Sequence, residues 1–185
     1  MDKTPIINNP ELLDKVLGEV QKGLTNNLPW LNYAFGRAQR LVKEIRKRKH
    51  YIPGVYSGKN DYLEVSPDAD IGNFSFFKIE DPQLMDWDPK IRGRIKADFS
   101  LIFWFDLRKI EGTQGRNTEM VKAQILKALN GGFPIRNGRI SISRIYEEAE
   151  NIYKGYSIQE VDNQFLMHPY AGFRFKGTLT INESC

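Results

Sequence analysis

Carboxylate and histidine side chains are the first candidates for catalysis in this sequence. The acidic residues gather in three places: Asp68 with Asp70, residues 81–88, and Glu147 with Glu148 and Glu150. The first two groups stand among prolines, where aspartate commonly initiates turns. His50 and His168 have no carboxylate or cysteine nearby at a spacing typical of metal ligands. These residues therefore predict turns and solvated surface rather than a catalytic or metal centre.

The sequence motifs of the common catalytic and nucleotide-binding sites do not occur. There is no G-x-S-x-G, no G-x-x-x-x-G-K-[ST], no H-E-x-x-H and no G-x-G-x-x-G that opens a helix. We expect a protein that is not an enzyme and that needs no cofactor. A hydrolase that uses Asp68, Asp70 or the Glu147–Glu148 pair is the catalytic alternative.

A run of basic residues between positions 37 and 49 is the strongest charge feature. Seven cations and one carboxylate, Glu44, give it an excess of six positive charges, whereas the whole chain has a net charge of +4. Such asymmetry indicates contact with a polyanion or with an acidic protein surface. The alternative is a solvated helix face, because the last turn of a helix favours cations. The basic run comprises Arg37, Arg40, Lys43, Arg46, Lys47, Arg48 and Lys49.

Apolar spacing predicts three helices. Residues 10–27 and 30–45 carry apolar side chains at three- and four-residue steps, which is typical of amphipathic helices. A third helix is predicted over 119–129, with Asn117 or Thr118 as its cap. The N-terminal part of the chain, residues 1–50, is therefore predicted to be a helical segment.

Alternating apolar residues predict a sheet in the rest of the chain. Residues 94–108 are apolar at every odd position from 95 to 107, which indicates a long strand with one buried face. Its other face is apolar at Ile102 and Trp104, so a helix or a neighbouring subunit must cover it. With Trp87, these two residues are the candidates for a subunit interface. Other strands are predicted over 51–56, 62–65, 74–79, 139–146 and 171–181.

The composition is that of a chain that folds around a core. The chain has 185 residues, of which 41% are hydrophobic, and a single cysteine, Cys185. Its length fits one domain, and no apolar run is long enough to span a membrane. Strands in succession, with one helix inserted among them, favour an α+β fold. We predict a largely antiparallel sheet in residues 51–185 that carries the helices on one face and forms one compact unit with residues 1–50.

This order of elements resembles the tail-terminator and head–tail joining (neck ring) proteins of double-stranded DNA bacteriophages, including those of crAss-like phages. The resemblance covers about residues 51–181 and depends on element order rather than on a signature motif. The longer helical N-terminus and the insertion-like segment 147–167 depart from the family pattern. The segments that carry the resemblance are an N-terminal amphipathic helix leading into the proline-containing strand 51–56, the long strand 95–107 with its capped helix 117–129, and the closing strand 173–181.

The resemblance implies a structural virion protein. Such proteins close into rings, commonly six- or twelve-fold, that connect the portal or head to the tail around the DNA channel. The implied partners are further copies of the chain, the portal and other neck or tail proteins, with non-specific contact to packaged DNA and no membrane. The implied location is the neck or tail of a virion assembled in the host cytoplasm. The alternative function is that of a small nucleic-acid-binding accessory protein, which would use the basic run.

Overall fold

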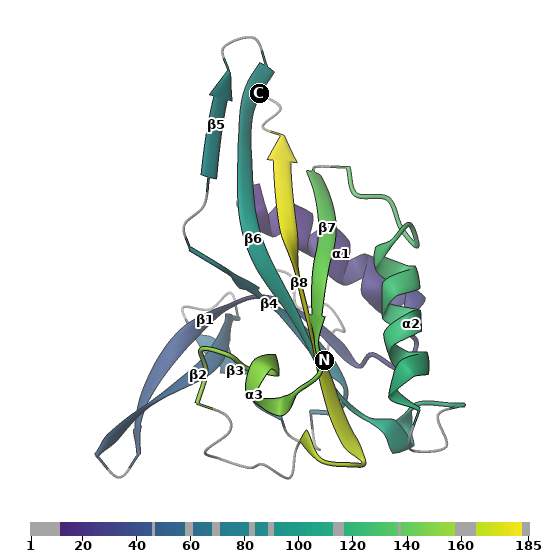
Figure 1. Ribbon diagram of the computed structural model, residues 1–185. Coiled ribbons are helices and arrows are strands. Elements are labelled where there is room, and N and C mark those ends of the chain that lie inside the picture. Colours follow the sequence, from purple (N-terminus) through teal and green to yellow (C-terminus); the bar gives the residue numbers. More distant parts are fainter. Residues whose placement is uncertain are drawn as a thin grey trace.

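The computed structural model describes residues 12–45, 47–57, 61–67, 71–81, 84–88, 91–112, 117–136, 138–157 and 166–182. For residues 45, 84–88, 91–94 and 182 it describes the backbone and not the side chains. The described residues form an eight-stranded sheet with three α-helices (Figure 1). The helices are α1 (Leu12–Asn27), α2 (Thr118–Leu129) and α3 (Ala149–Ile152). The strands are β1 (Tyr33–Ile45), β2 (Arg48–Tyr56), β3 (Tyr62–Glu64), β4 (Phe74–Ile79), β5 (Leu84–Asp88), β6 (Ile91–Asp106), β7 (Gly138–Tyr146) and β8 (Tyr170–Asn182).

The strands follow the order β3-β2-β1-β4-β6-β8-β7, and β5 pairs with β6 beside this path. Neighbouring strands are antiparallel except for β1 and β4, which are parallel. The ladder between β6 and β8 runs from Arg94↔Asn182 to Asp106↔Tyr170. The predicted α+β class with a largely antiparallel sheet is therefore confirmed.

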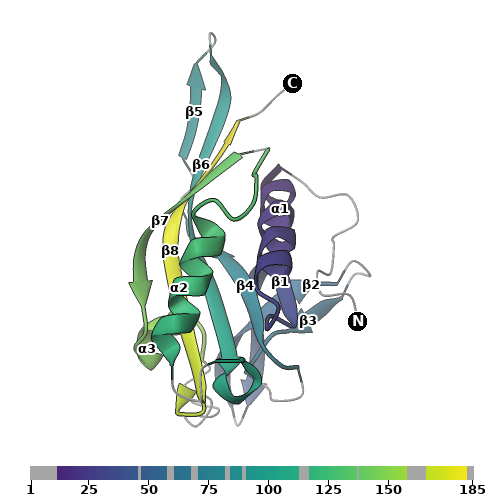
Figure 2. The ribbon, with the colours of Figure 1, turned by 90° about the vertical axis from the view of Figure 1, so that its right-hand side faces the viewer.

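The sheet buries a hydrophobic core on each of its faces. Helices α1 and α2 lie side by side on one face (Figure 2), where Leu17 and Ile125 pack with Phe103. On the other face, α3 and the turn after it bring Tyr153 and Tyr156 into a second core. Two buried faces explain why the central strands are apolar on both sides.

The alternation along β6 distributes its side chains between these two cores. Phe103 and Phe105 face the helices α1 and α2, whereas Ile102 and Trp104 face the second core. Ile102 and Trp104 are both 0% exposed within the single chain. Their assignment as subunit-interface candidates is therefore wrong, because α3, β4 and the start of β8 cover them.

Residues 33–45 form the strand β1, where a helix over 30–45 was predicted. A register irregularity between Ala34 and Arg37 in the pairing with β4 shifts the alternation by one residue. Ala34 consequently faces the first core, while Phe35 and Ala38, three residues apart, both face the second. The irregularity gives a strand the spacing of a helix, and residues 33–45 belong to the sheet instead of to a helical N-terminal segment.

Buried Asn73 fixes the point at which β1 begins. Its backbone carbonyl accepts hydrogen bonds from the amides of Asn32 (2.8 Å) and Tyr33 (3.1 Å). Its side chain donates to the Trp30 carbonyl (3.0 Å) and accepts from the Asp106 amide (2.8 Å). The start of β1 is thus tied both to β4 and to the end of β6.

Two glycine substitutions are expected to change stability in opposite directions. A Cβ at Gly177 in β8 would overlap the Ser141 carbonyl oxygen of β7, so Gly177→Ala is expected to lower the free energy of unfolding by about 1 to 3 kcal/mol. A Cβ at Gly18 in α1 would meet no atom within 4 Å. Gly18→Ala is therefore expected to raise the free energy of unfolding by about 0.5 to 1 kcal/mol. Urea titration of both variants measures the difference. Equal effects would mean that β7 and β8 do not approach as closely as described.

Candidate functional site

The basic run lies at the outer end of the β1–β2 hairpin and not at the end of a helix. The two strands pair from Ala38↔Val55 to Ile45↔Arg48, and the hairpin extends away from the rest of the sheet (Figure 1). Ala38 and Val55 at its base are buried, whereas residues 47–49 at its end are exposed. The sequence therefore identified the charged segment correctly but assigned it to the wrong element.

The structure brings most of the basic residues to one place. Arg37 is half-buried near the base of the hairpin, and Arg46 lies outside the described residues. The other five are exposed along the outer half of the hairpin, where the only described carboxylate is Glu44, directly opposite Lys49. These five residues, called the basic tip below, are Arg40, Lys43, Lys47, Arg48 and Lys49.

Contacts with neighbouring segments support the hairpin as far as Tyr51. The Arg40 guanidinium lies 3.9 Å from the centre of the Tyr51 ring. The Tyr51 backbone donates to the Ser157 hydroxyl (3.0 Å) and accepts from the Ser157 amide (2.7 Å). Lys43 forms an ion pair with Glu64 of β3. These contacts hold Arg40 and Lys43, while residues 47–49 lie beyond them.

The turn at the end of the hairpin contains an unfavourable backbone conformation. Lys47 has a φ of 63°, in the left-handed region that glycine and asparagine adopt most readily. A lysine held there costs about 1 kcal/mol relative to glycine. The hairpin thus presents a lysine at a position where its backbone conformation favours glycine or asparagine.

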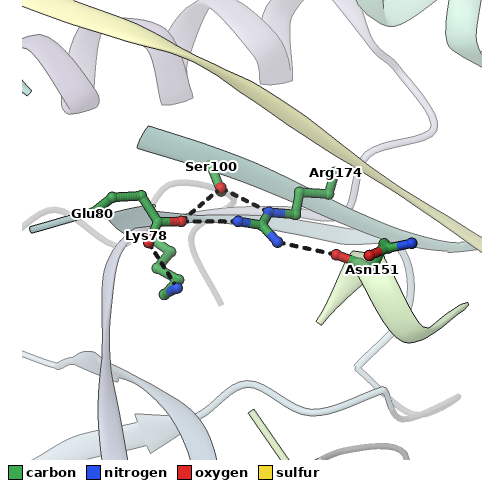
Figure 3. Close-up of polar contacts among 5 residues, drawn as sticks. All are labelled: Lys78, Glu80, Ser100, Asn151 and Arg174. Atoms are coloured by element: carbon green, nitrogen blue, oxygen red, sulfur yellow. Dashed lines mark hydrogen bonds and ion pairs between the residues drawn. The ribbon is translucent and has the colours of Figure 1, made fainter. Parts of the chain in front are cut away.

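A second group of charged side chains, buried or half-buried, lies on the α3 side of the sheet (Figure 3). Arg174 of β8 donates to Glu80 (2.9 Å), to the Ser100 hydroxyl (2.8 Å) and to the Asn151 carbonyl (3.1 Å). The Lys78 ammonium lies 2.9 Å from the same carboxylate of Glu80. The Arg174 side chain is only 7% exposed, so this cluster joins β4, β6, β8 and α3 from the inside.

The charges around Glu80 keep it ionised. Burial alone would raise the pKa of its carboxyl group, but hydrogen bonds from Lys78 and Ser100 and the charges of Lys78 and Arg174 lower the pKa below 4.5. A cavity of about 480 Å³ adjoins the cluster, and its walls carry both cations and carboxylates. This mixture of positive and negative charges on the walls favours no class of ligand. The contacts of Arg174 indicate that the cluster has a structural role.

Of the predicted acidic sites, the structure describes the Glu147–Glu148 pair. Glu147 accepts a hydrogen bond from Lys122, and Glu148 accepts one from Asn151 (3.0 Å). Asp68 and Asp70 lie outside the described residues. Among the residues that the structure describes, no three His, Cys, Asp or Glu side chains are grouped so that they could hold a metal ion.

Two further findings concern the described helices and the comparison with known proteins. Within the described part of the chain, no helix is long and apolar enough to cross a membrane. The sequence matches none of the protein-family models and none of the curated proteins with which it was compared.

Proposed function

We propose that this protein is a structural component of a virion, and that copies of it form a ring that connects the portal or head to the tail. The observation that carries the proposal is a pair of hairpins, β1–β2 and β5–β6, whose outer ends are two-stranded and extend from opposite ends of one sheet (Figure 1). A two-stranded hairpin is at best marginally stable in water without further packing. Two different projecting hairpins supply the two unlike surfaces that a closed head-to-tail ring requires.

The β5–β6 hairpin is the better candidate for contacts between copies. β6 pairs with β8 only from Arg94 onward, so its first residues pair with β5 alone. Trp87 lies within β5, and its side chain is outside the described residues. Trp87 remains a predicted interface residue because tryptophan is enriched where subunits meet.

The order of elements also supports the proposal. The strand β2 with Pro53, the long strand β6, the capped helix α2 and the closing strand β8 come in the order expected for the family that the sequence resembles, although the strand β1 separates α1 from β2. The Asn117 side chain caps α2 by accepting a hydrogen bond from the Met120 amide (2.9 Å). Because Ile102 and Trp104 are buried within the single chain, the proposed surfaces for assembly are the hairpins and not the face of the sheet.

Shortening the β5–β6 hairpin is expected to abolish ring formation and to leave the fold intact. In the variant, Asn-Gly replaces residues 86–94, so that the pair Met85↔Ile95 closes a two-residue turn. Native mass spectrometry and negative-stain microscopy would compare this variant with the wild-type chain, each alone and mixed with portal protein.

We expect closed rings from the wild-type chain and monomers from the variant. Circular dichroism provides the control that the variant still folds. A wild-type chain that stays monomeric alone and with portal protein would overturn the proposed function. Rings that form equally well from the shortened variant would show that this hairpin is not the contact.

A further inference from the structure

Cations surround the outer end of the β1–β2 hairpin on every side. Side chains of directly opposed residues in an antiparallel pair lie on the same face. Arg40 and Lys49 therefore lie on the face of the buried Ala38, whereas Lys43 and Arg48 lie on the opposite face. Lys47 occupies the turn between them. A partner that contacts all five residues must be negatively charged on both sides of the hairpin.

The shape of the hairpin fits a groove between two rows of negative charge. The major groove of duplex DNA is about 12 Å wide and admits a two-stranded β-ribbon, with a phosphate backbone along each wall. Both faces of the ribbon would then lie against phosphates, and the turn would point into the groove. A flat acidic surface would contact only one face of the hairpin.

The residue types at the tip also favour phosphates over a protein surface. Protein interfaces are depleted in lysine and have an apolar core. Three of the five tip cations are lysines, and the exposed apolar side chain among them is Val42, at 58%. Within the described residues, Lys47, Arg48 and Lys49 form no ion pair, and the one described carboxylate on the outer half of the hairpin is Glu44, opposite Lys49. The left-handed Lys47 adds a cation in spite of its backbone cost.

We propose that the basic tip binds the phosphate backbone of double-stranded DNA without reading its sequence. Lys47, Arg48 and Lys49 make the contacts, and Arg40 and Lys43, which Tyr51 and Glu64 hold in place, flank them. The interaction belongs to the single chain and does not depend on ring formation. A ring would multiply the contacts by presenting several tips to one duplex.

Binding of a fluorescent duplex of about 30 base pairs tests the inference, with anisotropy measured between about 50 and 200 mM salt. The test variant is Lys47→Gln/Arg48→Gln/Lys49→Gln. The matched control, Lys15→Gln/Lys22→Gln/Lys127→Gln, removes the same charge from exposed positions on α1 and α2. All six positions are exposed, so both variants are expected to fold, which circular dichroism checks.

Three lost phosphate contacts are expected to weaken binding about 100-fold near 100 mM salt and to reduce the slope of log affinity against log salt by about 2.7. The control variant is expected to bind within about threefold of the wild-type chain, because its lysines lie away from the hairpin. Duplexes rich in A·T and in G·C are expected to bind equally.

Three results would overturn the inference. The first is DNA binding that survives in the tip variant, and the second is equal loss in the control variant. The third is tighter binding to poly-glutamate than to DNA at matched charge, which would assign the tip to an acidic protein surface instead. Because the proposed contacts belong to the single chain, failure of ring assembly would not produce any of these results.

Discussion

Replacement of Trp104 by alanine is expected to lower the free energy of unfolding by about 3 to 5 kcal/mol. The indole is 0% exposed and stacks between Phe74, at 5.6 Å between ring centres, and Tyr170, at 5.2 Å. Alanine would leave a cavity between β4, β6 and β8 that rigid strands cannot fill. Urea titration measures the loss as a lower midpoint with an unchanged slope.

Val42→Ala is the matched control, because Val42 is 58% exposed on the β1–β2 hairpin. The free energy of unfolding of the Val42→Ala variant is expected to stay within about 0.5 kcal/mol of the wild-type value. If Trp104→Ala were as harmless as Val42→Ala and instead prevented assembly, Trp104 would be an interface residue and the burial described above would be incorrect. The comparison therefore separates a core role from an assembly role.

The elements whose sequence signal is local and regular could be predicted. β6 is apolar at every odd position from 95 to 105, and the side chains from Phe99 to Phe105 at these positions face the core that α1 and α2 cover. α2 begins at a capping Asn117. β7 and β8 were also predicted with nearly their observed bounds. In each case a single physical rule, either alternation or capping, acts on neighbouring residues without interruption.

Residues 51–56 of β2 were predicted as a strand, but β1 and its pairing with β2 could not be predicted, for two reasons. The register irregularity between Ala34 and Arg37 disguises β1 as a helix. In addition, the turn before Arg48 contains no glycine, asparagine or proline, although two-residue hairpin turns usually require one. The charge of the basic run was visible in the composition, but its display around a hairpin tip follows from strand pairing between distant residues.

The buried charged cluster had no sequence signal. Arg174 and Glu80 are 94 residues apart, and Arg174 occupies a position that alternation predicts to be solvent-exposed. Helix α3 and the turn after it cover that face, and neither was predicted as a helix because residues 147–154 are mostly polar. Only the tertiary structure shows that this arginine is buried.

Arg174→Met is the second substitution with a large expected effect, a loss of about 2 to 3 kcal/mol in the free energy of unfolding. Methionine keeps the aliphatic packing but removes the donors to Glu80, Ser100 and the Asn151 carbonyl. A half-buried carboxylate that loses its charged partner is costly, although the 22% exposure of Glu80 keeps the loss below that of a fully buried pair. Thermal and urea unfolding measure this loss of stability. The control is Arg139→Met, because Arg139 is an exposed arginine on β7.

The free energy of unfolding of the same two variants, measured as a function of pH, separates the charge interaction of Arg174 from its packing. The pKa of Glu80 is lower in the folded chain than the ordinary value of a glutamate. Its contribution to stability is therefore present above that ordinary value and is lost as the pH falls through the folded value. In Arg174→Met the pKa of Glu80 rises, so less stability remains to be lost in acid. The difference in stability between the wild-type chain and Arg174→Met is therefore expected to narrow below about pH 4.5 and to stay constant for Arg139→Met. A difference that does not change with pH would assign the effect of Arg174 to packing alone.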